Sequence, residues 1–252
     1  MKSLCTLLLV SFMGMPALAQ ESATATQESA AKQKMKKKKT VDPSGTWRWT
    51  QENQDGESID HQVIIQANKK NEVVGVYSGL IDDFKSKEGK IEGDHLKMKF
   101  VYEGGGTPID VIYDAKIKGV EVVGTIVTGE QGEQSYEWKA KRTVELSDVV
   151  GTWKLDVTTP EGESHTPTFV VKKDGGDYVA TYTSELGDFK VTDLKAKKNR
   201  FSFKVAGEID GQSLTAEAVS MPKGDKLVGE ILAKLGGDEA TLEFTGKREK
   251  KK

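Results

Sequence analysis

Side chains that commonly carry out catalysis or bind metals are few in this sequence. Its three histidines, His61, His95 and His165, are widely separated, and Cys5 is the only cysteine. Zinc sites need closely spaced Cys and His ligands, and the zinc proteases need a His-Glu-x-x-His motif. Neither pattern occurs, nor does the Gly-x-Ser-x-Gly motif of serine hydrolases. We therefore expect no metal site and no cofactor.

Paired carboxylates are the remaining candidates for catalysis, because two carboxyl groups about 5 to 10 Å apart can hydrolyse a glycosidic bond. Asp82 with Asp83, and Glu185 with Asp188, occupy the same mid-repeat segment in two similar halves of the chain. A turn with exposed acids explains them equally well, and an active site duplicated intact is the rarer outcome. We expect a protein that is not an enzyme, with a hydrolase using these acids as an alternative.

Aromatic side chains are the candidates for ligand binding. The mouth of a small β-barrel is the default ligand site of that architecture, and a small apolar or carbohydrate ligand there would contact inward-facing aromatics. The candidates are Tyr77, Phe100, Tyr102 and Tyr113 in the first half of the chain and Tyr182, Phe201 and Phe203 in the second. The competing interpretation is that they form the core, since an eight-stranded barrel is just wide enough for its own side chains to fill it.

An internal duplication supplies the elements that would position these residues. Gly45-Thr46-Trp47 recurs 106 positions later as Gly151-Thr152-Trp153, and Lys141-Arg142 recurs at the same offset as Lys247-Arg248. Between these ends the offset slips by one to three residues, as changes in loop length would produce. The sequence predicts two copies of one domain, joined by residues 143–149.

Both copies have the period-two pattern of antiparallel strands. From Phe201 to Val205 the odd positions are apolar and the even positions polar, so one face of the strand is buried. Turn sequences such as Asp55-Gly56 and Lys118-Gly119 recur about every 8 to 15 residues, and no stretch has a convincing helical period. About seven or eight short strands per copy bury a common face best by closing into an up-and-down barrel. We predict an all-β protein of two tandem antiparallel barrels, with a β-sandwich as the alternative closure.

The N-terminus has the features of a secretory signal peptide. Lys2 precedes an apolar run from Leu7 to Met13, and Ala17-Leu18-Ala19 gives a small-x-small cleavage site. The pattern predicts export to the periplasm or the extracellular space after cleavage near Ala19, with no membrane span. Cys5 precedes the apolar run, whereas a lipidated cysteine would follow it.

Lysines cluster near both ends of the mature chain, at residues 34–39 and 247–252. Such clusters can hold anionic lipid headgroups, polysaccharide or nucleic acid, although a solvated, solubilising tail is the simpler interpretation. The formal net charge of the whole chain is only −2, so no global field attracts nucleic acid. The predicted parts are a signal peptide (1–19), a disordered Lys-rich leader (20–40), two barrels (41–142 and 147–248) and a basic tail (249–252).

The two copies resemble the lipocalin and avidin-like (calycin) small barrels, because each opens with Gly-x-Trp and closes with Lys-Arg. In those barrels the Trp packs across the closed end and a basic side chain from the last strand lies over its ring. The resemblance implies that Arg142 or Lys141 covers Trp47 beside Gly45, and that Arg248 or Lys247 covers Trp153 beside Gly151. Such a stack contributes about 0.5 to 2 kcal/mol. The second copy, with Pro160-Glu161-Gly162-Glu163, is also similar to short lipocalin-like modules of exported bacterial proteins, whereas the first copy lacks the proline.

These features together predict an exported, non-enzymatic binding or structural protein. As a binding protein it would hold a small apolar or carbohydrate ligand. One alternative is an envelope or matrix protein that adheres to anionic polymers through its Lys-rich ends. The other is the hydrolase described above.

Overall fold

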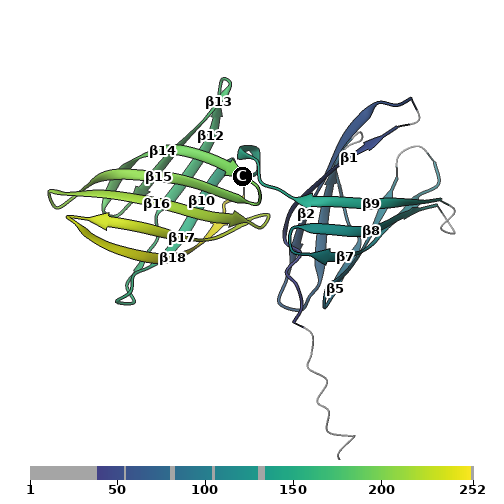
Figure 1. The fold of residues 1–252 in the computed structure, drawn as a ribbon, viewed down its shortest axis with the longest axis horizontal. Helices are drawn as coiled ribbons and strands as arrows, with labels where there is room; N and C mark the ends of the chain where they lie inside the picture. The colour runs from purple at the N-terminus through teal and green to yellow at the C-terminus, as the bar shows by residue number, and fades with distance from the viewer. Residues whose placement is uncertain (1–38, 54, 80–82, 104–105, 130–133, 251–252) are drawn as a thin grey trace, which may run out of the picture. The chain divides into compact units, whose positions relative to one another are not determined.

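A computed structural model describes residues 39–53, 55–79, 83–103, 106–129 and 134–250. The predicted signal peptide, nearly all of the predicted leader and the last two lysines lie outside these residues. From Lys39 onward the chain forms one compact unit, in which two antiparallel sheets follow one another along the sequence (Figure 1).

The first sheet contains nine strands among the described residues, in the order β4-β3-β2-β1-β9-β8-β7-β6-β5. Their bounds are β1 Gly45–Glu52, β2 Ser58–Ala67, β3 Val73–Ser78, β4 Phe84–Lys85, β5 Glu88–Glu92, β6 His95–Tyr102, β7 Ile109–Lys118, β8 Glu121–Thr128 and β9 Gln134–Arg142. Tight turns join successive strands where the sequence predicts them. Gly119, between β7 and β8, has a φ of +63°, which glycine adopts without strain.

The second sheet also contains nine strands in the described part of the chain. Their bounds are β10 Gly151–Thr158, β11 Ser164–His165, β12 Thr168–Asp174, β13 Asp177–Ser184, β14 Gly187–Lys197, β15 Arg200–Ile209, β16 Gln212–Pro222, β17 Lys226–Leu235 and β18 Asp238–Arg248. Strand β10 pairs with both β12 and β18, so these eight strands close into a barrel, and the two-residue β11 adds to the edge of β10.

The two sheets close to different extents. Six consecutive pairs, from Trp153–Arg248 to Thr158–Glu243, join β10 to β18. In the first sheet only Trp47–Arg142 and Arg48–Lys141 pair β1 with β9, and Figure 1 shows the β1–β2 hairpin bending away from β9 beyond them. The predicted all-β, antiparallel architecture is therefore confirmed, with a closed eight-stranded barrel in the second copy and a half-barrel in the first.

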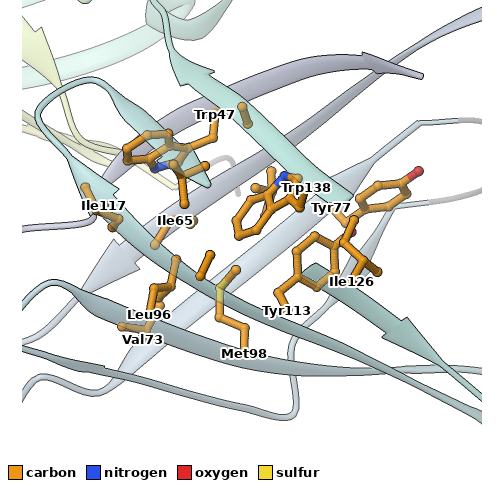
Figure 2. Close-up of a cluster of buried hydrophobic side chains, with 14 of the residues drawn as sticks. Trp47, Ile65, Val73, Tyr77, Leu96, Met98, Tyr113, Ile117, Ile126 and Trp138 are labelled. Carbon is orange, nitrogen blue, oxygen red and sulfur yellow. The ribbon is translucent and has the colours of Figure 1, made fainter. Parts of the chain in front are cut away.

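Each sheet encloses a hydrophobic core of its own. The first core surrounds Trp47, Phe100 and Trp138, whose side chains are fully buried, and Figure 2 shows how it fills the space between the strands. The second surrounds Trp153 and Phe169, and no buried residue belongs to both clusters. Each opening tryptophan donates its indole N–H to the carbonyl oxygen four residues earlier, at 2.8 Å in the first copy and 2.9 Å in the second. The duplication seen in the sequence thus extends to side-chain hydrogen bonds.

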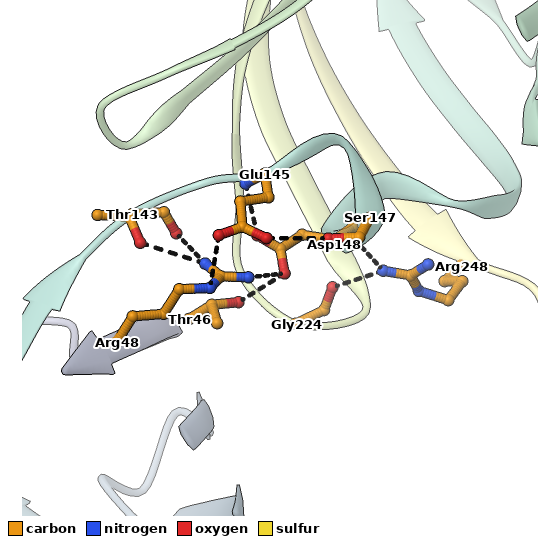
Figure 3. Close-up of polar contacts among 8 residues, drawn as sticks. All are labelled: Thr46, Arg48, Thr143, Glu145, Ser147, Asp148, Gly224 and Arg248. Atoms are coloured by element: carbon orange, nitrogen blue, oxygen red, sulfur yellow. Dashed lines mark hydrogen bonds and ion pairs between the residues drawn. The ribbon is translucent and has the colours of Figure 1, made fainter. Parts of the chain in front are cut away.

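Residues 143–150 connect the two sheets and contain a single turn of 3-10 helix, η1 Leu146–Val149. Arg48 anchors this connection, because its Nη2 lies 2.7 Å from an Asp148 carboxylate oxygen and its Nε 3.2 Å from a Glu145 carboxylate oxygen (Figure 3). Arg248 donates to the backbone carbonyl of Asp148 at 2.6 Å. Side chains from β1 and β18 therefore hold the same short segment.

Candidate functional site

One end of each copy is closed by an arginine stacked on a tryptophan. The guanidinium carbon of Arg142 lies 4.6 Å from the centre of the Trp47 ring, and that of Arg248 lies 4.2 Å from the Trp153 ring. In both Lys-Arg pairs it is the arginine that covers the ring. Gly45 leaves room for this stack, because a Cβ at this position would lie 3.1 Å from the Arg142 side chain. These ends are packed, so we look for a candidate site in the other parts of each copy.

The closed barrel of the second copy contains a cavity of about 460 Å³. Its wall is mainly aliphatic and aromatic, with Val205, Leu214, Ile231 and Leu242 among the lining residues. A row of small side chains leaves this space open, since Ala216 pairs with Ala233 across β16 and β17, and Ala233 pairs with Ala240 across β17 and β18. All three alanines line the cavity.

A fourth alanine, Ala218, also lines the cavity, and the equivalent position in the first copy carries a large side chain. Ala115 pairs with Gly124 in the first sheet, and Ser220 pairs with Gly229 in the second. Gly124 and Gly229 are equivalent in the repeat, and counting from them places Tyr113 where the second copy has Ala218. Both residues are buried, so the tyrosine ring occupies volume that the alanine leaves free. This exchange contributes to the difference between the mostly aliphatic cavity of the second copy and the smaller, aromatic pocket described for the first.

The mouth of the cavity carries acidic groups and no lysine or arginine among its described lining residues. These groups are Glu161, Asp238 and Glu239. Glu239 also accepts a salt bridge from Lys234 at 2.6 Å. His165 at the same mouth hydrogen-bonds through Nδ1 to the carboxylate of Glu185. An anionic ligand group would meet repulsion here, whereas a neutral or cationic one would not.

Two titrating groups beside the cavity have shifted pKa values. Burial raises the pKa of Tyr182 to about 12, with a smaller contribution from the Glu185 charge, so its hydroxyl stays neutral and can donate a hydrogen bond. Hydrogen bonds from its own backbone N–H and from His165 lower the pKa of Glu185. A carboxyl group that acts as a general acid needs the opposite shift.

The first copy has a smaller pocket, of about 330 Å³, at the end opposite Trp47. Its wall is aromatic and holds no Asp, Glu, Lys or Arg among the described lining residues. Trp49 stacks on His61 with ring centres 5.2 Å apart, and His61 Nδ1 lies 2.6 Å from the Tyr77 hydroxyl. Burial lowers the pKa of His61, opposed by the charge of Asp60.

Most of the aromatic residues proposed from the sequence lie at these two pockets. Tyr77, Tyr102 and Tyr113 line the first pocket, and Tyr182 and Phe203 line the second cavity. Phe100 and Phe201 are fully buried and line neither. Phe100 packs on Phe84 and Tyr113, and Phe201 on Phe169 and Phe203. For these two phenylalanines the structure therefore supports the core interpretation.

Several lining residues were missed in the sequence. Trp49 and His61 lie in the inward phase of β1 and β2, two residues from Trp47 and Val63 respectively, so extending the alternation from those core residues would have found them. The alanines of β16 to β18 give no such signal, because a small apolar residue on a strand reads equally well as ordinary core.

The acids considered for hydrolysis do not gather into a described site. Asp82 lies outside the described residues, Glu185 is bonded to His165, and Asp188 is exposed on β14. Over the described ranges, no group of three His, Cys, Asp or Glu side chains is placed to hold a metal ion. A helix with the length and apolar character to cross a membrane is likewise not found in that part of the chain. The Lys-rich ends lie mostly outside the described residues, so adhesion to anionic polymers stays a prediction.

Comparisons with known proteins give no family for this chain. No protein-family model and no curated protein sequence matches it. Among solved structures, a "putative outer membrane protein" of Bacteroides fragilis is similar at 13% identity and a TM-score of 0.28, covering 81% of this chain and 97% of that one. A protein of unknown function from the DUF3598 family of Nostoc punctiforme is similar at 12% identity and a TM-score of 0.25, covering 82% and 96%. At these TM-scores neither similarity bears on function.

Proposed function

We propose that the protein is a non-enzymatic binding protein that holds a small apolar ligand in the barrel of its second copy. The observation that carries this proposal is the cavity of about 460 Å³ lined by aliphatic side chains. Ligand pockets typically span about 300 to 1,000 Å³, with mostly apolar walls and a few polar groups. The alanines at positions 216, 233 and 240 keep that volume free.

The polar groups at the mouth narrow the class of ligand. Three carboxylates line the opening, and an ion pair is described for Glu239 alone, with Lys234. The cavity therefore disfavours fatty acids and other apolar carboxylates and favours neutral molecules or those with a cationic group. A carbohydrate fits less well, because its hydroxyl groups would face an aliphatic wall and lose their hydrogen bonds with water.

The proposal includes a lipocalin-like character for both copies and export of the mature chain. The arginines stacked on Trp47 and Trp153 at the closed ends support the first point. The Lys2, apolar-run and Ala17-Leu18-Ala19 pattern supports the second. Export would place the binding site in the periplasm or outside the cell.

Titration with N-phenyl-1-naphthylamine, a neutral apolar dye that fluoresces when it leaves water, tests the proposal. We expect one dye per chain, and binding about tenfold weaker or worse in Ala233→Phe, which places a ring inside the cavity. The matched control is Leu232→Phe, because Leu232 is the neighbouring residue on β17 and is 39% exposed. Equal dye affinity in Ala233→Phe and Leu232→Phe would refute the site.

A further inference from the structure

The seam between β1 and β9 in the first copy presents two unpaired strand edges. Thr143 donates its backbone N–H to Thr46 at 3.1 Å, so the even-numbered residues of β1 direct their backbone groups toward β9. Arg142 donates to Val120 at 2.7 Å on the other side, so the odd-numbered residues of β9 face β1. Pairing nevertheless stops at Arg48–Lys141.

Backbone donors and acceptors are therefore left facing the open seam. On β1 they belong to Thr50 and Glu52, and on β9 to Lys139, Glu137 and Ser135, for which the described structure contains no strand partner on that side. A partner segment of four extended residues would cover about 13 Å of such an edge. Exposed edges of this kind are templates for pairing with another extended chain.

A groove of about 910 Å³ follows this seam. Thr50 lines it from β1 and Lys139 from β9, while Trp49 and His61 reach it from the inner face of the sheet. Its charged lining residues are balanced, with Arg48, Lys139 and Lys141 against Asp60, Glu121 and Glu145. This balance gives no attraction for a polyanion or a polycation, so backbone hydrogen bonding is the dominant complementarity.

The second copy shows that the fold can close the same seam. There β18 continues along β10 for six pairs, and Thr245, the repeat equivalent of Lys139, pairs with Asp156. The opening in the first copy is therefore a difference between the copies and is not imposed by the architecture.

We propose that the β1–β9 seam of the first copy binds an extended segment of a partner polypeptide by strand addition. At least four residues of the segment run along the seam, starting where Thr50 of β1 and Lys139 of β9 face each other. It carries apolar or aromatic side chains at alternate positions, to face Trp49 and His61, and polar side chains between them, to face solvent. This proposal is independent of the ligand cavity in the second copy.

A fluorescent peptide with the sequence of residues 240–246, Ala-Thr-Leu-Glu-Phe-Thr-Gly, is a suitable probe, because its last four residues, 243–246, already pair with β10 in the second copy. We expect it to bind the whole protein at one site, measured by fluorescence anisotropy. Hydrogen exchange should then slow at the amides of Thr50, Glu52, Ser135, Glu137 and Lys139. N-methylation of the peptide's Glu and second Thr removes the two N–H groups that in β18 point toward β10. The methylated peptide should bind at least tenfold more weakly.

Two matched proline variants separate a binding edge from a structural strand. Lys139→Pro removes an N–H that faces the open seam, so it should abolish peptide binding and leave the melting temperature nearly unchanged. Thr245→Pro removes an N–H used in the β10–β18 ladder, so it should lower the melting temperature of the second copy.

Three results would overturn the proposal. One is the absence of peptide binding to the wild-type protein, and another is binding that survives Lys139→Pro. The third is slow exchange of the seam amides in the free protein. If that protection disappears when residues 20–38 are deleted, the seam belongs to the chain's own N-terminal segment and not to a partner.

Discussion

At the scale of single residues, the two Arg-Trp stacks are equivalent in position but differ in how well the arginine is satisfied. Arg248 donates to the carbonyls of Asp148 and Val150 and pairs with the Asp225 carboxylate at 3.2 Å. Arg142 donates to the Asp42 carbonyl at 2.8 Å, while its buried Nε has no hydrogen-bond partner among the described residues. The second stack should therefore contribute more to stability.

Replacing each arginine by methionine keeps an unbranched apolar stem and removes the charged guanidinium group. We expect Arg248→Met to lower the free energy of unfolding by about 3 kcal/mol, because cation–π and charge-assisted hydrogen bonds are both lost. Arg142→Met should cost about 1 kcal/mol, since it also removes an unsatisfied buried group. Urea unfolding followed by circular dichroism measures both, and equal losses would contradict the ranking.

His61 predicts how the first copy responds to pH. Its pKa in the folded protein lies below the usual value of about 6.5, so the unfolded chain takes up a proton first as the pH falls. Neutral His61 therefore contributes fully to the free energy of unfolding above about pH 6.5, and this contribution is lost as the pH falls below that value.

We therefore expect the urea midpoint of the first copy to fall between pH 7 and pH 5, and to fall less in His61→Gln. Tryptophan fluorescence in a Trp153→Phe background reports on this copy alone, because the other three tryptophans lie at positions 47, 49 and 138. An identical pH dependence with and without His61 would show that other groups cause the loss.

At the scale of strands, the glycines matched across the repeat mark close approaches between neighbouring strands. A Cβ on Gly229 would lie 2.3 Å from the carbonyl oxygen of Val219 on β16, and a Cβ on Gly124 would lie 2.1 Å from that of Asp114 on β7. Gly176, in the turn between β12 and β13, has no atom within 4 Å of such a Cβ. Backbone atoms cannot move aside as a flexible side chain can.

Gly229→Ala should consequently destabilise the second copy by about 1 to 3 kcal/mol, the usual cost of overpacking. Gly176→Ala is the control and should change stability by less than about 0.5 kcal/mol. Thermal unfolding compares the two, and a neutral Gly229→Ala would mean that β16 and β17 can separate without cost.

Strands and turns were predictable from local sequence, and closure was not. The alternation of Phe201 to Val205 became β15, and Lys118-Gly119 became the β7–β8 turn. How far β1 pairs with β9 depends on backbone contacts between strands about 90 residues apart, on which single-strand patterns give no information. The single turn η1 was also missed, since four residues are too few for a helical period.

The cavity lay beyond prediction for a related reason. The exchange of Tyr113 for Ala218 becomes visible only when the register of β7 on β8 is superposed on that of β16 on β17. The slips in repeat offset hide that register in the sequence. The aromatic residues proposed from the sequence therefore include members of both pockets, but the sequence does not show that the larger cavity lies in the second copy.

At the scale of the whole molecule, two separate cores predict two separate unfolding events. Phe169→Ala should cost the second copy about 3 to 5 kcal/mol, because Phe169 is fully buried. In the Trp153→Phe background this change should leave the fluorescence midpoint of the first copy unmoved, whereas Phe100→Ala should lower it. A shift of the first-copy midpoint by Phe169→Ala would show that the copies unfold as one unit.

Under the proposals made here, the second copy is the ligand-binding barrel and the first is an aromatic-lined half-barrel with an open seam. This division follows from differences between otherwise equivalent positions. Tyr113 fills the first copy where Ala218 leaves the second open. Ladder pairs stop after Lys141 in the first copy and continue through Glu243 in the second. We therefore propose that the duplication supplies one scaffold for two kinds of binding surface.

The most direct test of the central claim is native mass spectrometry of the protein purified from its natural host, with any released molecule identified after denaturation. We predict one small, apolar, non-anionic molecule per chain, present in wild type and in Leu232→Phe and absent from Ala233→Phe. A bare wild-type mass, or a bound molecule that Ala233→Phe retains, would contradict the assignment of the cavity as the binding site.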